Sequence, residues 1–566
     1  MRAADRPRRL AALLALVALL ATGCAAIPDS GPVENGPPIE AGDQTEQQFI
    51  PNGPVAGADQ EAILRGFVAA ATGSQDDYAT AREFLTADAA GDWDPRASVL
   101  ILDTASPTVS RVDEAALQYT VRVASEVDAT GVYAESETAE ATSLYYRFTQ
   151  VDGEWRIAEP PSGIVLDGSS FQSLFAARTL YFFDPGYDYL VPDVRWFPLR
   201  DGGGSGSTRI VSALLAGPAA WLRGAVLSAF PEGTSLSPVG AVPVSDGVAA
   251  VDLSTEALAA SSGQLLRMRQ QLVASLSQST PGVTQVAITV DQQPVTITDD
   301  GDGSAVRAPS AADTRSLVRT ADELGFSSSG EITGLQGLSA QAIELGATSF
   351  TLGRTQAAAA ALTPGGAAVL RRDAASVLVD ARAGQIAPDL DPAGYVWSGV
   401  ANDAQLAVHD QQGAGYPLAS ALPAGLRLTD LEVSRDGTRL ALLVDDAGEP
   451  RLLVAAILRD DGAPSGLGAP IEVQLDAQAA SGATWIDDAN LAVLAERDGE
   501  TVVTSHQVGG RSVDLGRPGD GVQIMGAGDL DRLRVLDADG TVLQPRSSGT
   551  GWRSGTTGVV FLGRQL

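Results

Sequence analysis

A short phrase repeats through the last part of the chain, and it limits the fold more than any other feature of the sequence. The phrase joins turn residues such as Asp, Asn or Gly to an apolar run, with apolar centres at Val369, Leu406, Leu440, Leu491 and Leu533. The steps between these centres are 37, 34, 51 and 42 residues, with a mean of 41. One blade of a four-stranded propeller takes about 40–45 residues. Residues 331–566 are therefore predicted to form an all-β propeller of about five to six blades, whose ring can close with a strand from elsewhere in the chain.

The rival architecture for this region is a parallel β-helix, but its repeats are much shorter than 41 residues. Two tryptophans also favour the propeller because each precedes the phrase at a similar offset. Trp397 lies nine residues before Leu406, and Trp485 lies six residues before Leu491.

The amino terminus is predicted to be a secretory signal peptide over residues 1–23. Four arginines between Arg2 and Arg9 form a basic segment, and the apolar run from Leu10 to Ala21 follows it. A run of about a dozen residues is too short to cross the ~30 Å hydrocarbon core of a bilayer as an ordinary helix. No other stretch of the sequence approaches the ~18 apolar residues of a membrane span.

The signal peptide ends in Leu20, Ala21, Thr22 and Gly23, directly before Cys24, which is the single cysteine of the chain. This ending resembles the lipobox of bacterial lipoproteins, although Ala21 stands where leucine is usual. The resemblance implies that Cys24 becomes the first mature residue and carries an S-diacylglyceryl group, with a third acyl chain on its new amino group as a further option. Two acyl chains hold a protein stably on a membrane. The alternative is ordinary signal cleavage near residues 21–23 with an incidental cysteine.

Few side chains in this sequence can carry reactive chemistry. All 38 basic residues are arginine, and the two histidines, His409 and His506, lie in separate segments. The single cysteine excludes disulfides within the chain and multi-cysteine zinc sites, and the lack of lysine excludes Schiff-base chemistry and Walker-type phosphate loops. We therefore predict no catalytic residue, no metal ligand and no cofactor, and we interpret both histidines as ordinary surface or strand residues. A net charge of −32 also argues against nucleic acid as a partner.

The region between the signal peptide and the propeller divides into four parts. Residues 24–58, rich in Pro, Gly, Asp and Glu, are predicted to be an extended tether. Residues 59–166 begin with helical spacing and continue with alternating strands, including a predicted hairpin turn at Asp152-Gly153, which indicates an α+β domain. Residues 172–298 again mix helices and strands, with Ser261 at a helix start. Residues 299–330 are predicted to be a polar linker. A calcium interpretation of its acidic start is disfavoured, because the twelfth position counted from Asp300 is Ala311 rather than an acid.

Several of these segments resemble known families. The strand at 152–157 resembles the last strand of an NTF2-like cone fold, and the segments at 214–218, 230–234 and 251–254 resemble the GerMN domain of spore-germination proteins and lipoproteins. With the lipobox and the propeller in this order, the whole chain resembles the actinobacterial lipoprotein LpqB family. The resemblance implies a multidomain protein with an α+β NTF2-like cone domain, an α+β GerMN-like domain and an all-β propeller.

The resemblance also implies a function. Proteins of this family are thought to lie lipid-anchored on the extracytoplasmic face of the cytoplasmic membrane and to bind the extracellular region of a sensor histidine kinase, in the MtrA/MtrB two-component system of cell-wall homeostasis and division. We therefore expect a non-catalytic regulator. The alternatives are a lipoprotein that binds wall glycan or a solute, and, with less support, a propeller glycosidase that uses paired carboxylates.

Overall fold

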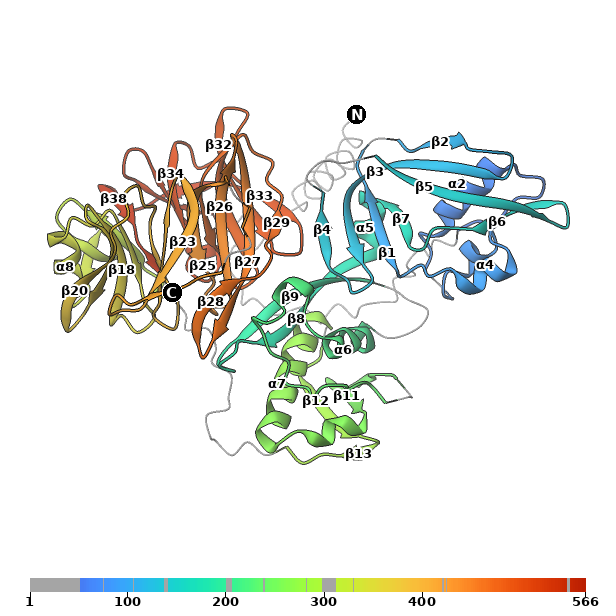
Figure 1. The fold of residues 1–566 in the computed structure, drawn as a ribbon, viewed down its shortest axis with the longest axis horizontal. Helices are drawn as coiled ribbons and strands as arrows, with labels where there is room; N and C mark the ends of the chain where they lie inside the picture. The colour runs from blue at the N-terminus through green and yellow to red at the C-terminus, as the bar shows by residue number, and fades with distance from the viewer. Residues whose placement is uncertain are drawn as a thin grey trace, which may run out of the picture. The chain divides into compact units, whose positions relative to one another are not determined.

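The computed structural model describes residues 51–566 except 75, 105, 137–140, 200–205, 238–239, 281, 298–311, 329, 420–421, 424 and 547–549 (Figure 1). The predicted signal peptide, the lipobox and most of the predicted tether lie outside this part of the chain. Residues 51–566 form one compact unit. The structure has an α+β N-terminal domain, a second α+β domain and a C-terminal propeller, as the sequence predicts.

The N-terminal domain packs short helices against a twisted sheet. Its helices are α2 (Gln60–Ala70), α3 (Ala79–Arg82) and α4 (Ala87–Asp92). The strands are β1 (Ser98–Leu102), β2 (Thr108–Arg111), β3 (Ala116–Asp128), β4 (Tyr133–Glu135), β5 (Ala141–Val151), β6 (Glu154–Glu159) and β7 (Ile164–Asp167). The sheet order is β6-β5-β3-β1-β7, and both β2 and β4 pair with β3. The predicted turn is confirmed: Asp152 and Gly153 both have positive φ, as a tight hairpin requires.

A long hairpin connects the first domain to the second. Helix α5 (Gly168–Leu174) leads into β8 (Phe175–Phe183), which pairs along its length with β9 (Leu190–Pro198). Phe175 and Trp196, at one end of the hairpin, belong to the core of the N-terminal domain. Leu180, Phe182 and Val191, at the other end, belong to the core of the second domain. One continuous hairpin therefore contributes side chains to both hydrophobic cores.

The second domain is built around a long helix that crosses between two parallel strands. Its elements are α6 (Gly206–Ala216), η1 (Ala220–Leu222), β10 (Val244–Ser245), β11 (Val248–Leu253), η2 (Thr255–Ala259), α7 (Ser262–Ser279), β12 (Gln285–Val290) and β13 (Gln293–Pro294). The predicted start of α7 is confirmed, because the Ser261 hydroxyl accepts a hydrogen bond from the backbone N–H of Gln264 at 3.3 Å. Met268, Leu272 and Leu276 line the buried face of this helix.

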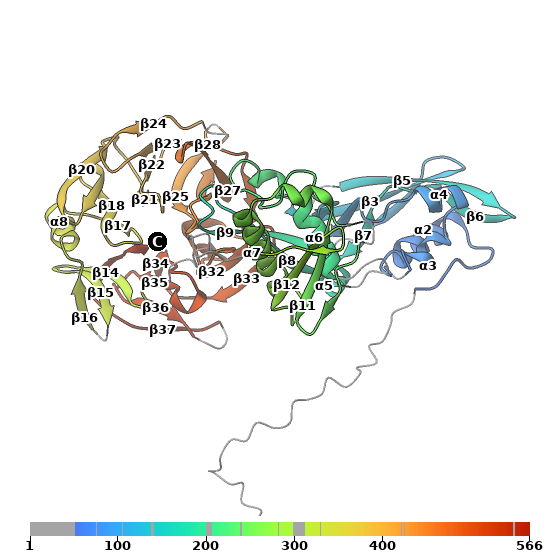
Figure 2. The same ribbon diagram turned by 90° about the horizontal axis from the view of Figure 1, so that it is seen from below.

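The C-terminal region folds into six sheets among the described residues, arranged as a ring (Figure 2). The first holds β14 (Ser316–Thr320), β15 (Leu324–Ser328), β16 (Glu331–Gly334) and β38 (Val559–Leu562). After α8 (Leu338–Glu344), the second holds β17 (Ser349–Leu352), β18 (Ala358–Thr363), β19 (Gly366–Arg371), β20 (Ala374–Asp380) and β39 (Arg564–Gln565). The third holds β21 (Asp389–Leu390), β22 (Val396–Val400), β23 (Asp403–His409) and β24 (Gly415–Tyr416).

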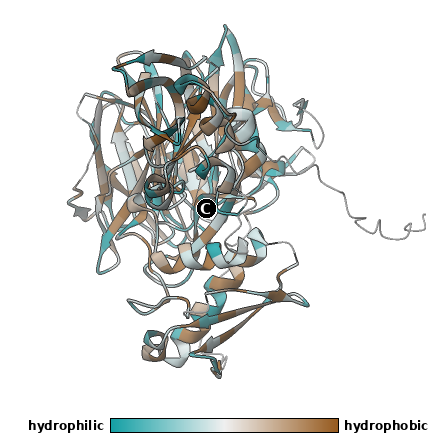
Figure 3. Cartoon of the chain, turned by 90° about the vertical axis from the view of Figure 1, so that its right-hand side faces the viewer, coloured by the Kyte–Doolittle hydropathy of each residue, from teal (hydrophilic) through white to brown (hydrophobic). Residues whose placement is uncertain are grey.

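The remaining three sheets follow in chain order. The fourth holds β25 (Arg427–Val433), β26 (Arg439–Asp446), β27 (Glu449–Asp460), β28 (Ala463–Leu467) and β29 (Ile471–Val473). The fifth holds β30 (Ala479–Trp485), β31 (Asn490–Arg497), β32 (Glu500–Gln507) and β33 (Ser512–Gly516). The sixth holds β34 (Gly521–Met525), β35 (Arg534–Asp537) after η3 (Leu530–Arg532), β36 (Val542–Pro545) and β37 (Trp552–Ser554). Figure 3 colours the chain by hydropathy and shows brown, hydrophobic segments in both helices and strands.

The carboxyl end of the chain closes the ring. Strand β38 pairs antiparallel with β14, and β39 pairs parallel with β17. The first sheet therefore combines three strands from the start of the region with one from its end, and Figure 2 shows the C-terminus in the middle of the ring.

Two details of the sequence interpretation are wrong. Strands β14 and β15 lie in the range predicted to be a linker, so the propeller begins earlier than residue 331. Polar residues flank short buried stretches there, in which Leu317, Val318, Leu324 and Phe326 are almost fully buried.

The repeated phrase also does not mark one equivalent strand. In chain order, the phrase falls on the third strand of its sheet at β19 and β23, but on the second strand at β26, β31 and β35. Both strand positions share the same pattern of a turn followed by apolar residues.

Candidate functional site

A cavity of about 590 Å³ lies where the N-terminal domain, strand β9 and helix α6 meet. Its walls are mostly apolar and aromatic, with Phe175, Trp196, Phe197 and Trp221 among the lining residues. Clefts and cavities of about 300–1,000 Å³ with mostly apolar walls and a few polar groups are the usual form of sites for small ligands. This cavity is therefore the candidate binding site of the molecule.

A buried ion pair on β9 forms part of the cavity wall. Arg195 Nε and Nη2 donate to the two carboxylate oxygens of Asp193 at 2.8 and 2.7 Å, and both side chains are only about 2% exposed. Residues i and i+2 of a strand point to the same side, which brings the two groups together. Each partner also reaches another element: Arg195 Nη1 donates to the Thr130 carbonyl, and Asp193 accepts from the Ala219 backbone N–H, both at 2.8 Å. The pair therefore connects a loop of the N-terminal domain to a loop of the second domain.

One face of helix α6 forms a further wall. Arg209, Ser212, Ala213 and Ala216 all line the cavity, and their spacing of three, four and seven residues places them on one side of a helix. The opposite face carries Ile210, Val211 and Leu214 into the core of the second domain. Small side chains at 212, 213 and 216 leave the space that larger residues would fill.

Four arginines, Arg96, Arg195, Arg209 and Arg223, and one acidic residue, Asp128, line the cavity. Two of these arginines are ion-paired, Arg195 with Asp193 at 2.7 Å and Arg96 with Asp77 at 2.8 Å. One carboxylate oxygen of Asp128 already accepts hydrogen bonds from the Thr130 N–H, the Thr130 hydroxyl and the Val132 N–H, at 2.8 to 3.0 Å.

A smaller cavity of about 290 Å³ adjoins the first and shares Val132, Trp221 and Ile471 with it. It reaches the propeller through β29 and the turn between β32 and β33. The Trp196 indole N–H donates to the Gly509 carbonyl at 3.0 Å, and the Arg511 guanidinium lies 5.6 Å from the centre of the Trp196 ring. Burial raises the pKa of Glu135 at the wall of this cavity, although hydrogen bonds from Tyr133 and the Gln474 backbone oppose the rise.

The centre of the propeller is filled by the carboxyl end of the chain. The guanidinium of Arg564 donates to Asp430 Oδ1 at 2.7 Å and to the Leu431 carbonyl at 2.6 Å, and its Nε lies 3.3 Å from Glu432 Oε2. Asp389 is fully buried nearby and accepts from the Val433 N–H at 2.7 Å. Burial raises the pKa of Glu432 and of Asp389, while the positive charge of Arg564 opposes the rise in both.

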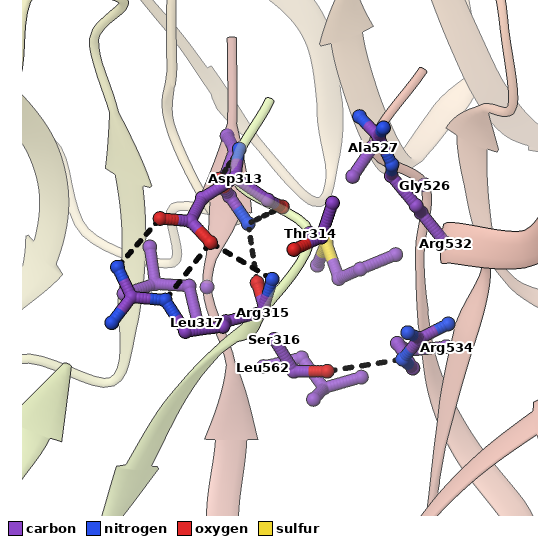
Figure 4. Close-up of a pocket in the computed structure, with 13 residues that line it drawn as sticks. Asp313, Thr314, Arg315, Ser316, Leu317, Gly526, Ala527, Arg532, Arg534 and Leu562 are labelled. Carbon is purple, nitrogen blue, oxygen red and sulfur yellow. Dashed lines mark hydrogen bonds and ion pairs between the residues drawn. The ribbon is translucent and has the colours of Figure 1, made fainter. Parts of the chain in front are cut away.

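Next to this cluster lies a small hollow, shown in Figure 4. Its volume of about 20 Å³ is the size of a single water. Asp313 pairs with Arg315 at 2.6 Å, and Arg534 Nε donates to the Ser316 hydroxyl at 3.0 Å. These groups satisfy one another, so we do not treat the hollow as a ligand site.

The site residues predicted from sequence fall elsewhere. Cys24 and the lipobox residues Leu20, Ala21, Thr22 and Gly23 lie outside the described residues. His409 ends strand β23 and His506 lies in β32, so the interpretation of both as strand residues is confirmed. Within the described ranges, no group of three or more His, Cys, Asp or Glu is placed to hold a metal ion. The helices described for this chain include none that is long and apolar enough to cross a membrane.

Sequence reasoning missed the groups that build the cavity and the propeller centre. The signal at Asp193 and Arg195 is an opposite-charge pair at i and i+2 inside an otherwise apolar strand. Arg564 is a charge between the apolar strand β38 and the C-terminal Leu566. In both cases a charged residue stands in an otherwise apolar segment. A charge in such a place indicates that it is buried together with a partner of opposite charge.

Three family models match successive parts of the chain. The model described as the N-terminal domain of lipoprotein LpqB matches residues 53–172, one described as sporulation and spore germination matches 179–296, and the lipoprotein LpqB beta-propeller domain matches 316–561. The propeller match starts at residue 316, where β14 also starts.

Individual relatives agree with these models. Lipoprotein LpqB of Cutibacterium acnes is 33% identical over 48% of this chain, an alignment that spans just under half (44%) of that relative. Lipoprotein LpqB of Streptomyces avermitilis is 26% identical over 97% of this chain and 96% of its own length. Among solved structures, the first GerMN domain of the sporulation protein GerM from Bacillus subtilis is 19% identical, and the alignment covers 21% of this chain and 86% of that domain. Its TM-score of 0.17 carries no argument of its own.

Proposed function

Because this chain belongs to the LpqB lipoprotein family, we propose that it is a non-catalytic regulator, lipid-anchored through Cys24 on the extracytoplasmic face of the cytoplasmic membrane. In this proposal its folded domains bind the extracellular region of a sensor histidine kinase and modulate signalling in cell-wall homeostasis. The single observation that supports a binding role best is the occupied centre of the propeller.

The centre of a propeller is where converging carboxylates would act in a glycosidase. Here the central acids Asp430 and Glu432 surround the buried Arg564 guanidinium, and their side chains are only 14% and 12% exposed. A carboxylate that is committed to a buried ion pair and covered by the chain's own C-terminus does not face a substrate. This arrangement favours a propeller that presents its outer surfaces to a partner over one that works through its centre.

The connection between the domains also supports this proposal. The hairpin β8–β9 belongs to two cores, and the Asp193–Arg195 pair bonds loops of both domains. Hydrogen bonds across a buried junction resist relative motion of the parts that they join. A stiff body at the membrane holds its binding surfaces in a fixed relation to a membrane partner.

The anchor is tested by metabolic labelling with a fatty-acid probe in cells that produce the parent protein or the Cys24→Ser variant. We expect label on the parent only, together with release of the variant from the membrane fraction. A variant that still carries label would overturn the assignment of the anchor to Cys24.

The partner is tested separately, with the soluble chain and the purified extracellular region of the kinase. Titration calorimetry should show saturable binding, and crosslinking in intact membranes should join the two full-length proteins. Absence of binding in both experiments would reject the kinase as partner while leaving the anchor untouched.

A further inference from the structure

The cavity of about 590 Å³ is lined by residues of all three folded domains. We propose that it binds an uncharged molecule with a hydrocarbon body, and that this ligand stabilises the arrangement of the three domains. The proposal goes beyond the regulatory function and does not depend on it, because the cavity would bind such a ligand whether or not a kinase is bound.

Each domain contributes a different wall. The loop 129–132, between β3 and β4, belongs to the N-terminal domain, and Ala213 and Ala216 lie on helix α6 of the second domain. Ile471 is the first residue of β29 in the fourth propeller sheet. A ligand in this space contacts all three domains at once. Because it binds only where the three walls meet, it should stabilise the native arrangement against unfolding.

The apolar walls favour a hydrocarbon body. Phe175, Trp196 and Phe197 line the cavity from the hairpin β8–β9, and Trp221 lines it from η1. Their rings supply flat apolar surfaces, and contact with a hydrocarbon removes the apolar surface of both partners from water. The volume lies within the range of sites for small organic ligands.

The arginines of the lining are engaged within the protein. Arg195 donates to both carboxylate oxygens of Asp193, and Arg96 pairs with Asp77 at 2.8 Å. Arg209 also has an interaction partner of its own. These three guanidinium groups are therefore already matched without a ligand.

The two remaining charges of the lining do not require a charged ligand either. One oxygen of Asp128 accepts hydrogen bonds from Thr130 and Val132, and Arg223 is exposed, so that water solvates its guanidinium. A charged group that entered the cavity would lose its own hydration among wall charges that are already matched, which is costly. The lining therefore favours an uncharged ligand over both anions and cations.

Small residues on α6 leave the space open. Ser212 and Ala216 are exposed on the cavity side of the helix, so a large side chain at either position projects into the space without entering the core. The same helix holds Ile210 and Leu214 in the core on its opposite face. The cavity can therefore be closed by mutation while the fold of the second domain is kept.

The first test uses residues 25–566, which include the compact unit Pro51–Leu566, and the uncharged dye Nile red, whose fluorescence rises in apolar surroundings. Titration should show one saturable site per chain. Decanol should displace the dye at a concentration about tenfold or more below that needed for decyl phosphate or decyltrimethylammonium, all kept below micelle formation. Decanol should also raise the temperature of thermal unfolding.

The second test closes the cavity. Ala216→Trp should abolish binding of Nile red and the thermal shift with decanol, and Ser212→Trp replaces it if it unfolds, as judged by thermal unfolding. Ser277→Trp is the matched control, because Ser277 is an exposed serine of helix α7 outside the cavity. This control should bind the dye as the parent does. Arg223→Gln should leave the affinity for decanol unchanged, because an uncharged ligand does not use the guanidinium.

Three results would overturn the proposal. One is the absence of saturable binding of Nile red to the parent protein, and another is equal binding of the dye to a folded blocking variant. The third is displacement of the dye by either charged decyl compound at a concentration as low as that of decanol, which would reject an uncharged ligand.

Discussion

Asp193 and Arg195, two residues apart on β9, form a bidentate ion pair that is almost fully buried and bonds a different domain through each partner. A surface ion pair contributes little to stability, but the loss of one member of a buried pair leaves an uncompensated charge in a low-dielectric environment. The geometry of this pair therefore predicts strong coupling between its members.

Replacement of either member alone should be strongly destabilising. We expect Asp193→Leu and Arg195→Leu each to lower the free energy of unfolding by about 3–5 kcal/mol, and the double variant to lose less than the sum of the two. Denaturant unfolding of the four proteins gives the coupling energy. The exposed pair Glu61–Arg65 on α2 is the matched control, and its removal should have little effect. Additive losses at positions 193 and 195 would show that the two side chains are not coupled, which would contradict their role as a buried ion pair.

Removal of the guanidinium from the propeller centre should destabilise the ring. Arg564→Leu leaves the buried Asp389 and the largely covered Asp430 and Glu432 without their cation, and we expect a loss of about 3–5 kcal/mol. Arg564→Lys should recover only part of this, because an ammonium group lacks the planar fork. Arg517, which forms an exposed pair with Glu500, provides the control variant Arg517→Leu. If Arg564→Leu and Arg517→Leu unfold at the same denaturant concentration, the ion pairs of Arg564 at the centre of the ring do not stabilise the propeller.

The raised pKa of Glu432 predicts a stability that falls as the pH rises. Burial is the main cause of the shift, so the folded protein retains a proton on Glu432 above the pH at which the unfolded chain, with a pKa of 4.5, has released it. Folding then becomes less favourable as the pH rises above about 4.5 toward the folded-state pKa. The contribution of Glu432, measured as the difference in the free energy of unfolding between the parent protein and the Glu432→Gln variant, should show this decline, because the variant lacks the titrating carboxyl.

Asp380 provides the contrast for this experiment. Burial would raise its pKa, but the hydrogen bonds from Arg382, the Arg382 backbone and Ser398 outweigh burial and lower it. Its contribution is therefore present above its unfolded-state pKa of 3.8 and is lost only as the pH falls below that value. Asp380→Asn should shift the whole stability curve from about pH 5 to 8 without changing its slope. An unchanged slope in Glu432→Gln would show that this carboxyl is not protonated in the folded state.

His506 should make the protein sensitive to acid. Burial lowers its pKa from 6.5 to about 4, so below pH 6.5 the unfolded chain binds a proton that the folded protein does not. Stability should therefore be lost as the pH falls from 6.5 to about 4, by up to about 3 kcal/mol. His506→Gln should remove this loss in thermal unfolding between those pH values. His409→Gln is the control, because His409 is only half-buried and its pKa is lowered less by its surroundings than that of His506.

Much of the fold could be predicted because local patterns agree with the tertiary structure. The apolar stripe of α7 and its Ser261 cap act within one segment, and so does the turn at Asp152-Gly153. In each case the residues that determine the element lie within a few positions of one another, so no knowledge of distant segments is needed.

The features that could not be predicted all depend on distant partners. Strand β14 is short and flanked by polar residues, and it becomes a buried strand only because β38, far along the chain, covers its edge. Arg564 is tolerated inside the ring only because Asp430 and Glu432 come from another sheet. The cavity between the first two domains depends on how these domains, each with its own core, pack against one another. No periodicity in the sequence predicts that packing.

The closure of the ring by β38 also determines when this protein can fold as it is made. Strand β14 starts at Ser316, but its partner strand β38 starts only at Val559. During synthesis the first sheet remains one strand short, with an open edge able to pair with other chains, until the residues of β38 have been made. Contacts over such a sequence separation form slowly because the intervening loop must first be closed. The ring is therefore completed only once β38 is available, rather than blade by blade, and a chain cut short before β38 is left with an unpaired strand and an aggregation-prone edge.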